Sequence, residues 1–360
     1  MNAARVARGV CAALAITVGA AALGACSGDD GPAPRTSTTA PATSATTATT
    51  TPPSTAAPRP PETVAARQRL FGAEHVDANG AIREPGILVS WFGVSSLAAS
   101  LAGHVVLLDT YVNGDPPTTC SSSSPPADTA ALSYAPVSYD ELVALQPEAI
   151  FIGHGHYDHD CLAGVIAART GAVVVALPQE CDHLAQQVSD AGITDPLRCE
   201  PPLAADSPVG ATAAIEPLGP DVPVTVVRNL HSGGQTSGGA EALAYVIHAD
   251  GRTILWNDTT GPASAQAPDL LAALRTLGPV DAAFSASFGT DAVDYVEAVG
   301  ATVLYPVHHD FLGSGPNPDA SAGLRPAVEA ALRARRGLAT ELRWQQDPGD
   351  YLRPIVVGAP

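Results

Sequence analysis

The stretch that most constrains the fold of this chain is a histidine-rich loop directly after an apolar run, AIFIGHGHYDHDC at residues 149–161. The run AIFI has the length and apolar character of a buried strand, and Gly153 ends it. Three of the chain's ten histidines, together with an aspartate, then fall within positions 154–159. A single histidine is usually a hydrogen-bonded core or surface residue, but this density after a buried strand indicates a metal-binding loop.

The spacing inside the loop suggests two neighbouring sites. His154 and His156 are two residues apart, so an extended or turning backbone can aim both imidazoles at one point, and Gly155 lets the chain bend tightly between them. Asp158 and His159 follow where the chain should enter a helix, and they point to a second position. Imidazole nitrogen and carboxylate oxygen are ligands of Zn²⁺, and catalytic zinc sites keep one position for water. Each site still needs ligands from elsewhere in the chain.

Apolar runs alternate with helical patterns through both halves of the chain. Several of the strand-like runs are too apolar to alternate, which is typical of buried strands in an α/β protein. Asp250-Gly251 between two such runs predicts a hairpin. Strand-like segments lie at 86–101, 104–112, 149–153, 172–177, 224–230, 242–250, 253–258, 280–287 and 302–310, and helical patterns at 138–147, 161–171, 268–278, 291–300 and 326–337.

Polar residues recur at the carboxyl ends of these strand-like segments. His154 follows AIFIG, His231 follows VTVVRNL, Asp258 follows TILWN, and His308 follows TVLYPV. Ligand sites in layered α/β folds are commonly built where strand ends and their loops converge. We therefore expect these four segments to deliver side chains to one site.

The motifs resemble the signature of the metallo-β-lactamase superfamily from about Gly86 to Phe311. The segment WFGVSSLAASLAGHVVLLDTYV at 91–112 is similar to the opening hairpin of the branch that contains the ascorbate-6-phosphate lactonase-like hydrolases. This resemblance implies an α/β fold of the αββα four-layer sandwich type. Two sheets would lie face to face with helices outside them, and the metals would lie at one edge.

The resemblance also implies seven ligands for two metal ions, with Zn²⁺ expected and Mn²⁺ or Fe as alternatives. Asp158 and Asp258 would share the transfer of a proton to the leaving group. The first ion would be held by His154, His156 and His231, the second by Asp158, His159 and His308, and Asp258 would bridge the two.

Three further residues are expected near these ligands. Asp109, at the end of HVVLLD, would orient a metal-bound imidazole or simply cap its strand. Tyr157 would donate to an oxyanion in the pocket or lie on the surface. Asn257 stands where the family usually has glycine, and its side chain would touch the substrate or face a hydrogen-bonded turn.

Two adjacent histidines compete for the last ligand position. The segment PVHH at 306–309 is similar to the Pro-Ile-His-Tyr of the lactonase-like branch, so His308 is the expected ligand and His309 would lie behind it. The remaining histidines are not expected to bind the metals; they are His75, His104, His183 and His248.

The ligand set and the overall charge limit the function. A metal pair with these ligands implies a hydrolase in which a metal-bound hydroxide attacks an ester, a lactone or a phosphodiester. The alternatives are a non-catalytic metal-binding or ligand-binding lipoprotein and a mononuclear iron oxygenase on the same fold. The formal net charge of -18, with no basic stripe, argues against nucleic acid and for a small-molecule substrate. Oligomeric state is left open.

The amino-terminal part of the chain predicts secretion and anchoring. Residues 1–25 have a positive start and an alanine-rich apolar stretch, which is typical of a signal peptide. Leu23-Gly24-Ala25-Cys26 resembles a bacterial lipobox, so Cys26 is expected to carry lipid and tether the protein outside the cytoplasm; an ordinary cleaved signal is the alternative. Residues 26–66 are rich in threonine, proline and alanine and predict a disordered stalk, and residues 67–360 the folded domain.

Four cysteines fall within the expected domain, namely Cys120, Cys161, Cys181 and Cys199. Outside the cytoplasm an even set indicates disulfides, and four cysteines allow three pairings. Cys181 and Cys199 bracket a short segment and are a plausible pair, which would leave Cys120 with Cys161. The alternative is that Cys161, beside the histidine loop, binds metal.

Overall fold

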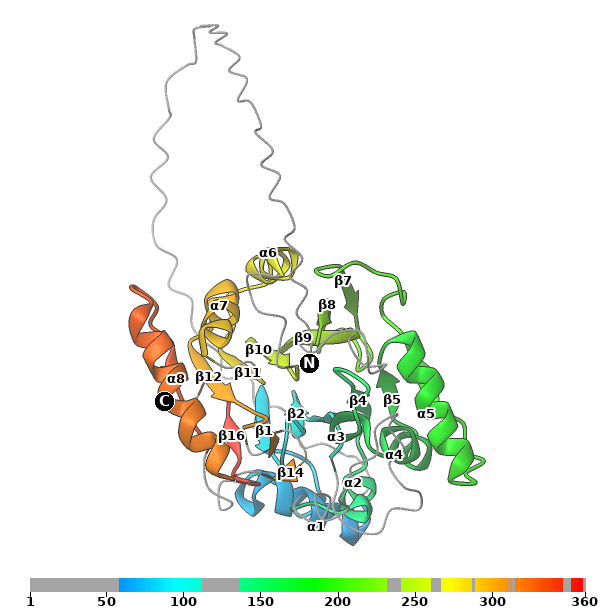
Figure 1. Ribbon diagram of the computed structural model, residues 1–360. Helices are drawn as coiled ribbons and strands as arrows, with labels where there is room; N and C mark the ends of the chain where they lie inside the picture. The colour runs from blue at the N-terminus through cyan, green and yellow to red at the C-terminus, as the bar shows by residue number, and fades with distance from the viewer. Residues whose placement is uncertain are drawn as a thin grey trace, which may run out of the picture. The chain divides into compact units, whose positions relative to one another are not determined.

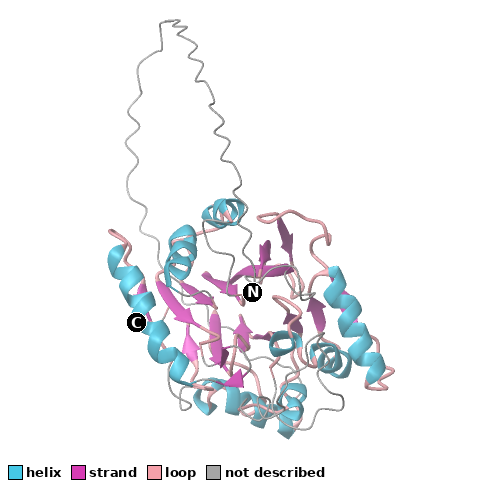
Figure 2. Cartoon of the chain, in the orientation of Figure 1, coloured by secondary structure: helices cyan, strands magenta, loops and turns pink. Residues whose placement is uncertain are grey.

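Two seven-stranded β-sheets lie face to face in the computed structural model, with helices on their outer sides (Figures 1 and 2). The structure describes residues 58–111, 136–231, 241–259, 267–286, 289–309, 311–312, 315–316, 318–345 and 351–358. The first sheet has the strand order β16-β1-β2-β3-β4-β5-β6, and the second has the order β15-β12-β11-β10-β9-β8-β7.

The first sheet is antiparallel across β16, β1, β2 and β3 and parallel from β3 to β6. Its strands are β1 (Ile87–Trp91), β2 (Leu97–Leu101), β3 (His104–Leu108), β4 (Ala149–Phe151), β5 (Val173–Val175), β6 (Arg198–Glu200) and β16 (Ile355–Val356). The helices that precede or connect them are α1 (Pro61–Phe71), the short 3-10 helix η1 (Ala73–His75), α2 (Tyr139–Ala144), α3 (Tyr157–Asp160), α4 (Ala163–Thr170) and α5 (Pro178–Asp190).

The second sheet is antiparallel from β7 to β10 and parallel across β10, β11, β12 and β15. Its strands are β7 (Thr212–Ile215), β8 (Val224–Leu230), β9 (Glu241–Ala249), β10 (Arg252–Asn257), β11 (Ala282–Ser285), β12 (Val303–Pro306) and β15 (Glu341–Leu342). Its helices are α6 (Pro268–Arg275), α7 (Gly289–Val299) and α8 (Pro318–Ala334), and β13 (Phe311–Leu312) pairs with β14 (Gly315–Pro316). The predicted hairpin at Asp250-Gly251 is confirmed, because Ala249 pairs with Arg252.

Buried side chains divide into three apolar layers, which is what four stacked layers of structure require. The layer between the sheets contains Val89 and Trp91 of β1 together with Tyr245 and Trp256 of the second sheet. The alternate residues of the same strands point outward. On the first sheet, the strand residues Leu88, Leu107 and Ile150 pack with Ile166 and Leu184 of helices α4 and α5. On the second sheet, Val246 and Leu255 pack with Leu270, Val296 and Val328 of helices α6, α7 and α8. The predicted αββα four-layer sandwich is confirmed.

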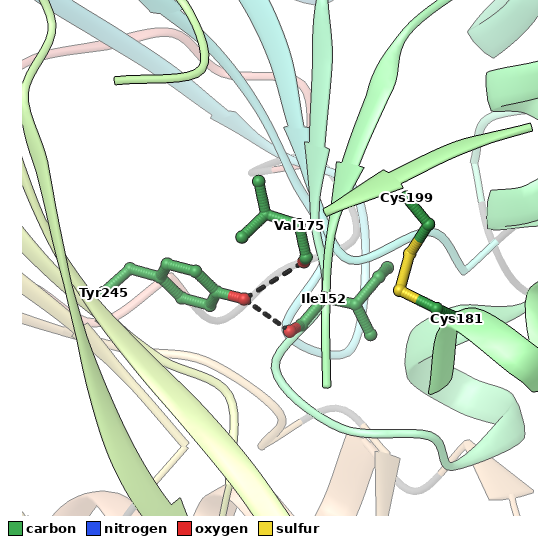
Figure 3. Close-up of a disulfide and its surroundings, with 5 residues drawn as sticks. All are labelled: Ile152, Val175, Cys181, Cys199 and Tyr245. Atoms are coloured by element: carbon green, nitrogen blue, oxygen red, sulfur yellow. Dashed lines mark hydrogen bonds between the residues drawn. A yellow bond between two sulfur atoms is a disulfide. The ribbon is translucent and has the colours of Figure 1, made fainter. Parts of the chain in front are cut away.

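Tyr245 connects the two sheets close to the histidine loop. Its hydroxyl, carried by β9, donates to the carbonyl oxygen of Ile152 at 2.7 Å and lies 3.2 Å from that of Val175 in β5 of the first sheet (Figure 3). A buried tyrosine hydroxyl needs such partners, since an unpaired hydroxyl in an apolar layer is costly. Ile152 directly follows β4, so this bond fixes the sheet edge from which the histidine loop leaves.

The folded body begins earlier than the predicted boundary after residue 66. Helix α1 starts at Pro61, and proline at a first helical position is favoured because its missing N–H has no partner to lose there. The guanidinium of Arg67 is buried and donates to the carbonyl oxygens of Gly80 at 2.9 Å and Leu145 at 3.2 Å. The signal overlooked in the sequence is Pro60-Pro61-Glu62, which marks a helix start.

The disulfides separate the cysteine alternatives. Cys181 of α5 is bonded to Cys199 of β6, with a Cα–Cα distance of 5.7 Å, as expected for this pair (Figure 3). Cys161 is also disulfide-bonded, so the alternative that it binds metal is wrong. Cys120, its expected partner, lies outside the described residues, as do the predicted signal peptide, Cys26 and most of the predicted stalk. None of the described helices combines the length and apolar character of a membrane span.

Candidate metal centre

The structure brings all seven predicted ligands together at the edge between the two sheets; we call this set the metal centre. The first sheet contributes the loop after β4, and the second contributes single residues after β8, β10 and β12. Ligating atoms lie within 4.8 Å of one another in each of three overlapping groups. The groups are His154 with His156 and His231, His154 with His159 and Asp258, and Asp158 with His159 and His308.

Two glycines allow the histidine loop to approach its neighbours. A Cβ atom on Gly153 would lie 2.0 Å from Cγ of Asp258, and one on Gly155 would lie 1.9 Å from Oε2 of Glu180. A larger residue at either position would have to displace one of these carboxylates, so packing as well as bending favours the sequence Gly-His-Gly-His. His156 then occupies the position that begins helix α3, and its side chain makes no capping hydrogen bond.

The first group consists of three mutually packed imidazoles. Ring centroids are 4.5 Å apart for His154 and His156, 4.6 Å for His154 and His231, and 4.6 Å for His156 and His231. Burial lowers the pKa of His156 to about 4 and that of His231 to about 3. Both rings are therefore neutral near pH 7, which is the form that binds a metal.

The second group forms a triangle of ligand atoms. Nε2 of His159 lies 3.2 Å from Nε2 of His308 and 3.6 Å from Oδ2 of Asp158, and the His308–Asp158 side is 3.4 Å. Two ligands of one tetrahedral zinc ion are about 3.3 Å apart, given bonds of about 2.0 to 2.1 Å. Burial alone would raise the pKa of Asp158, but His159 and His308 outweigh it and hold that pKa well below its usual range.

Asp258 lies between the two groups. Its Oδ2 is 2.6 Å from Nδ1 of His154 and 3.3 Å from Nδ1 of His159. Burial would raise the pKa of Asp258, but these two imidazoles outweigh burial and keep the carboxylate ionised. Oδ1 of Asp258 and Nε2 of His154 are both buried and have no hydrogen-bond partner among the described residues. Since buried polar atoms are rarely left unpaired, these two fit a bound cation.

Asp109 supports the histidine loop from behind. Its Oδ1 accepts a hydrogen bond from the backbone N–H of Gly153 at 3.1 Å, and its Oδ2 lies 2.7 Å from Nδ1 of His159. Burial first, and the charge of Asp258 second, raise the pKa of Asp109 to about 7. A carboxylate on the far ring nitrogen fixes the orientation of a ligand imidazole and leaves Nε2 facing the metal position. This arrangement matches the orienting role rather than a strand cap.

Ser95 is a supporting residue that the sequence reasoning missed. Its hydroxyl donates to Oδ2 of Asp109 at 2.6 Å and lies 2.8 Å from Nδ1 of His159. The turn that carries Ser95 also fixes His308, whose backbone N–H donates to the carbonyl of Val94 at 2.7 Å. His308 has a φ of 66°, a strained conformation that this bond helps to hold. The only sequence signal was the serine pair in the hairpin segment GVSS.

Two predicted neighbours of the ligands lie elsewhere. The side chain of Asn257 accepts a bond from Asn229 at 2.8 Å and donates to Ser285 Oγ at 3.4 Å, so it links strands of the second sheet. It lines a small space with Leu270 and Leu274 of α6, on the helix side of that sheet. It therefore takes the hydrogen-bonded role and lies beside helix α6.

His309 occupies a separate aromatic site. Its ring stacks on Trp91 with centroids 5.1 Å apart and lies 4.7 Å from that of Trp344. Burial lowers the pKa of His309 to about 4, so the neutral ring donates from Nε2 to the carbonyl oxygen of Gln345. The adjacent residues His308 and His309 therefore lie in different surroundings, the first in the metal centre and the second between Trp91 and Trp344.

The open side of the metal centre is marked by half-buried residues. His154, His159 and Asp258 are completely buried, whereas Tyr157 and two of the ligand histidines, His156 and His231, are half-buried. Burial raises the pKa of Tyr157 to about 12, so its hydroxyl keeps its proton near neutral pH.

A second cluster of ligand-type residues lies beside the centre and was not predicted. Asp160, Glu180 and His183 place one ligating atom each within 4.8 Å of one another. We call this set the α5 cluster, because helix α5 carries two of its members. His183 was expected not to bind metal, and its sequence context of glutamines gave no signal for this grouping.

Comparisons with known proteins find solved structures whose backbone fold is similar to that of this chain. No family model and no curated protein sequence matches. A metallo hydrolase from the hyperthermophilic archaeon Ignicoccus hospitalis is 16% identical over 72% of this chain and 95% of its own, with a TM-score of 0.46. An isothiocyanate hydrolase from Delia radicum gut bacteria is 13% identical over 76% of this chain and 100% of its own, with a TM-score of 0.47. CmlA, a diiron β-hydroxylase from Streptomyces venezuelae, is 13% identical over 75% of this chain and 54% of its own, with a TM-score of 0.47.

Proposed function

We propose that the protein is a metal-dependent hydrolase of the metallo-β-lactamase superfamily whose metal centre holds two Zn²⁺ ions. The observation that carries this proposal is the triangle of Asp158, His159 and His308, with sides of 3.2, 3.4 and 3.6 Å. Neither of two ring nitrogens 3.2 Å apart gains from the contact unless a proton or a cation lies between them. The mixture of imidazole and carboxylate favours zinc, with manganese or iron as alternatives.

The residues of the centre divide the chemical work. When bound, two such ions supply an activated water and a Lewis acid for the substrate. Asp109 and Ser95 hold His159, and the backbone of Val94 holds His308. Asp158 and Asp258 remain ionised, so either carboxylate can take a proton and pass it to the leaving group. Tyr157, at the open side, keeps its proton and can donate to a developing oxyanion.

The substrate that fits best is a small ester, lactone or phosphodiester. The net charge of -18 repels a polyanion, which disfavours nucleic acid. The resemblance of residues 91–112 to the lactonase-like branch makes a lactone the first compound to test.

The proposal is tested with a panel of esters, lactones, phosphodiesters and β-lactams, using wild type and Asp158→Ala. We expect wild type to bind zinc and to hydrolyse at least one class, and Asp158→Ala to lose that activity. Asp206→Ala, an exposed carboxylate away from the centre, is the matched control and should retain it. Equal activity in wild type and Asp158→Ala would refute the assignment. One iron per chain with oxygen-dependent turnover would favour an oxygenase, and bound metal without turnover a binding protein.

We also propose that the enzyme acts outside the cytoplasm, tethered to the membrane through lipid on Cys26. The support is the order of signal stretch, Leu23-Gly24-Ala25-Cys26 and stalk composition in the sequence, together with the Cys181–Cys199 disulfide, which suits an oxidising compartment. Membrane fractionation provides the test. Wild type should sediment with membranes and Cys26→Ser should not; identical distributions would exclude the lipid anchor.

A further inference from the structure

The α5 cluster joins two segments that meet beside the histidine loop. Asp160 is the last residue of α3, and Glu180 and His183 lie in the first half of α5. Residues three apart in a helix share a face, so both α5 side chains can point at Asp160. The ligating atoms of all three lie within 4.8 Å of one another.

Each carboxylate of the cluster is buried and has one oxygen without a hydrogen-bond partner among the described residues. Asp160 is 1% exposed and Glu180 is 4% exposed. Oε2 of Glu180 has no hydrogen-bond partner among the residues described by the structure. Oδ2 of Asp160 lies 3.0 Å from Nδ1 of His183, yet the two atoms lack hydrogen-bond geometry. That separation is close to the roughly 3.3 Å between two ligands of one tetrahedral ion.

The basic neighbour of these two carboxylates is His183, and no arginine of the described residues pairs with them. The chain has 18 arginines and no lysine. The arginine nearest to both in sequence, Arg169, is paired with Asp195 at 3.4 Å. Burial first, and then the charge of Asp160, raise the pKa of Glu180 to about 8. Two buried like charges need either a shared proton or a cation.

The position of the cluster gives a bound cation a structural role. The carboxylate of Glu180 packs directly against Gly155, where a Cβ would lie 1.9 Å from Oε2. Asp160 directly follows the ligand His159. An ion held by these residues would therefore fasten α5 to the loop that carries His154 and His156.

We propose that Asp160, Glu180 and His183 form a third metal site, separate from the metal centre, that binds a first-row divalent cation such as Zn²⁺ or Mn²⁺. Two carboxylates and one imidazole are a set that these ions prefer, whereas Ca²⁺ takes oxygen ligands. The side chain of His183 is 26% exposed, which leaves a path for the ion to enter. This site stands whether or not the protein is a hydrolase.

The test is metal stoichiometry after removal of metal with a chelator, reloading with Zn²⁺ and gel filtration. We expect about three zinc ions per wild-type chain and one fewer in His183→Ala and in Glu180→Gln. Asp258→Asn should lose zinc from the metal centre and keep this third ion. A His104→Ala variant, which changes a partly exposed histidine remote from both clusters, should match wild type.

Two results would overturn the proposal: equal zinc content in wild type and His183→Ala, or no anomalous peak between the three side chains in crystals of the zinc-loaded wild type. The crystal measurement needs no variant, so it decides the matter even if a substitution impairs folding. A single ion that is lost in His183→Ala but kept in Asp258→Asn would support this site and refute the proposed function. Loss restricted to Asp258→Asn would do the reverse.

Discussion

The metal centre and the α5 cluster are built from the same side-chain types but are supported differently. Candidate ligands of the metal centre come from four strand ends on two sheets, and residues behind them, such as Asp109 and Ser95, contact His159. The α5 cluster draws its three residues from two helices, α3 and α5, on one side of the sandwich. Preorganised ligands suit catalysis, because a reacting group must be held within a fraction of an ångström. The α5 cluster, which joins helix α5 to the end of α3, suits a structural ion.

The largest effect is expected from Gly153→Ala, which should impair the metal centre and spare the α5 cluster. The new methyl group collides with the carboxylate of Asp258, and displacement of a reacting group by about 1 Å can cost about 100-fold in rate. We expect kcat/KM on the best substrate of the panel to fall by about 100-fold or more. Gly323→Ala is the control, since a Cβ there meets nothing within 4 Å. An unchanged kcat/KM in Gly153→Ala would show that the reaction does not depend on the position of the Asp258 carboxylate.

The second prediction concerns the protonation of Glu180 in the α5 cluster when the protein is free of metal. The folded-state pKa of Glu180 is raised to about 8, so the folded state holds this proton more tightly than the unfolded state. Its stabilisation is therefore present below the unfolded value near 4.5 and is lost as pH rises through about 8. Between pH 5 and 8, wild type should lose about a few kcal/mol of unfolding free energy relative to Glu180→Gln. Denaturant titrations at several pH values measure this, and a constant difference would contradict it.

The third prediction concerns the support behind the metal centre. Asp109→Asn removes the charge that orients His159, and loss of such a partner typically costs about 10- to 100-fold in metal affinity. Competition with a chromophoric chelator should show this loss, with a smaller one for Ser95→Ala because the carboxylate remains. Zinc affinity equal to that of wild type in Asp109→Asn would mean that the ring of His159 is fixed by other contacts.

The smallest effect is expected where the two clusters touch. Gly155→Ala places a methyl group against Glu180, and because a carboxylate end can shift, we expect a loss of about 1 to 2 kcal/mol of unfolding free energy. In a double-mutant cycle, Glu180→Ala should relieve most of that loss. Additive effects of the two substitutions in thermal or denaturant unfolding would show that the contact does not exist.

The sequence alone predicted the sandwich and named the seven candidate ligands that the structure brings together. Apolar runs indicate strands that are buried on both faces. The motif His-Gly-His-Tyr-Asp-His places its metal-binding side chains within six consecutive residues, so both features can be recognised from a short stretch of sequence. Asp109 could be named because the end of HVVLLD resembles a family pattern in which an aspartate supports the histidine loop. These signals need no knowledge of which segments meet.

Tertiary structure decided which side chains face one another. Asn257 and Asp258 are adjacent in sequence, but a strand sends successive side chains to opposite faces, so one lies under α6 and the other in the metal centre. The pair His308 and His309 separates likewise, after a residue with positive φ. Ser95 and the α5 cluster depend on segments distant in sequence, such as 95 with 159 and 160 with 183. Such contacts arise only when the sheets and helices pack, and no local pattern encodes them.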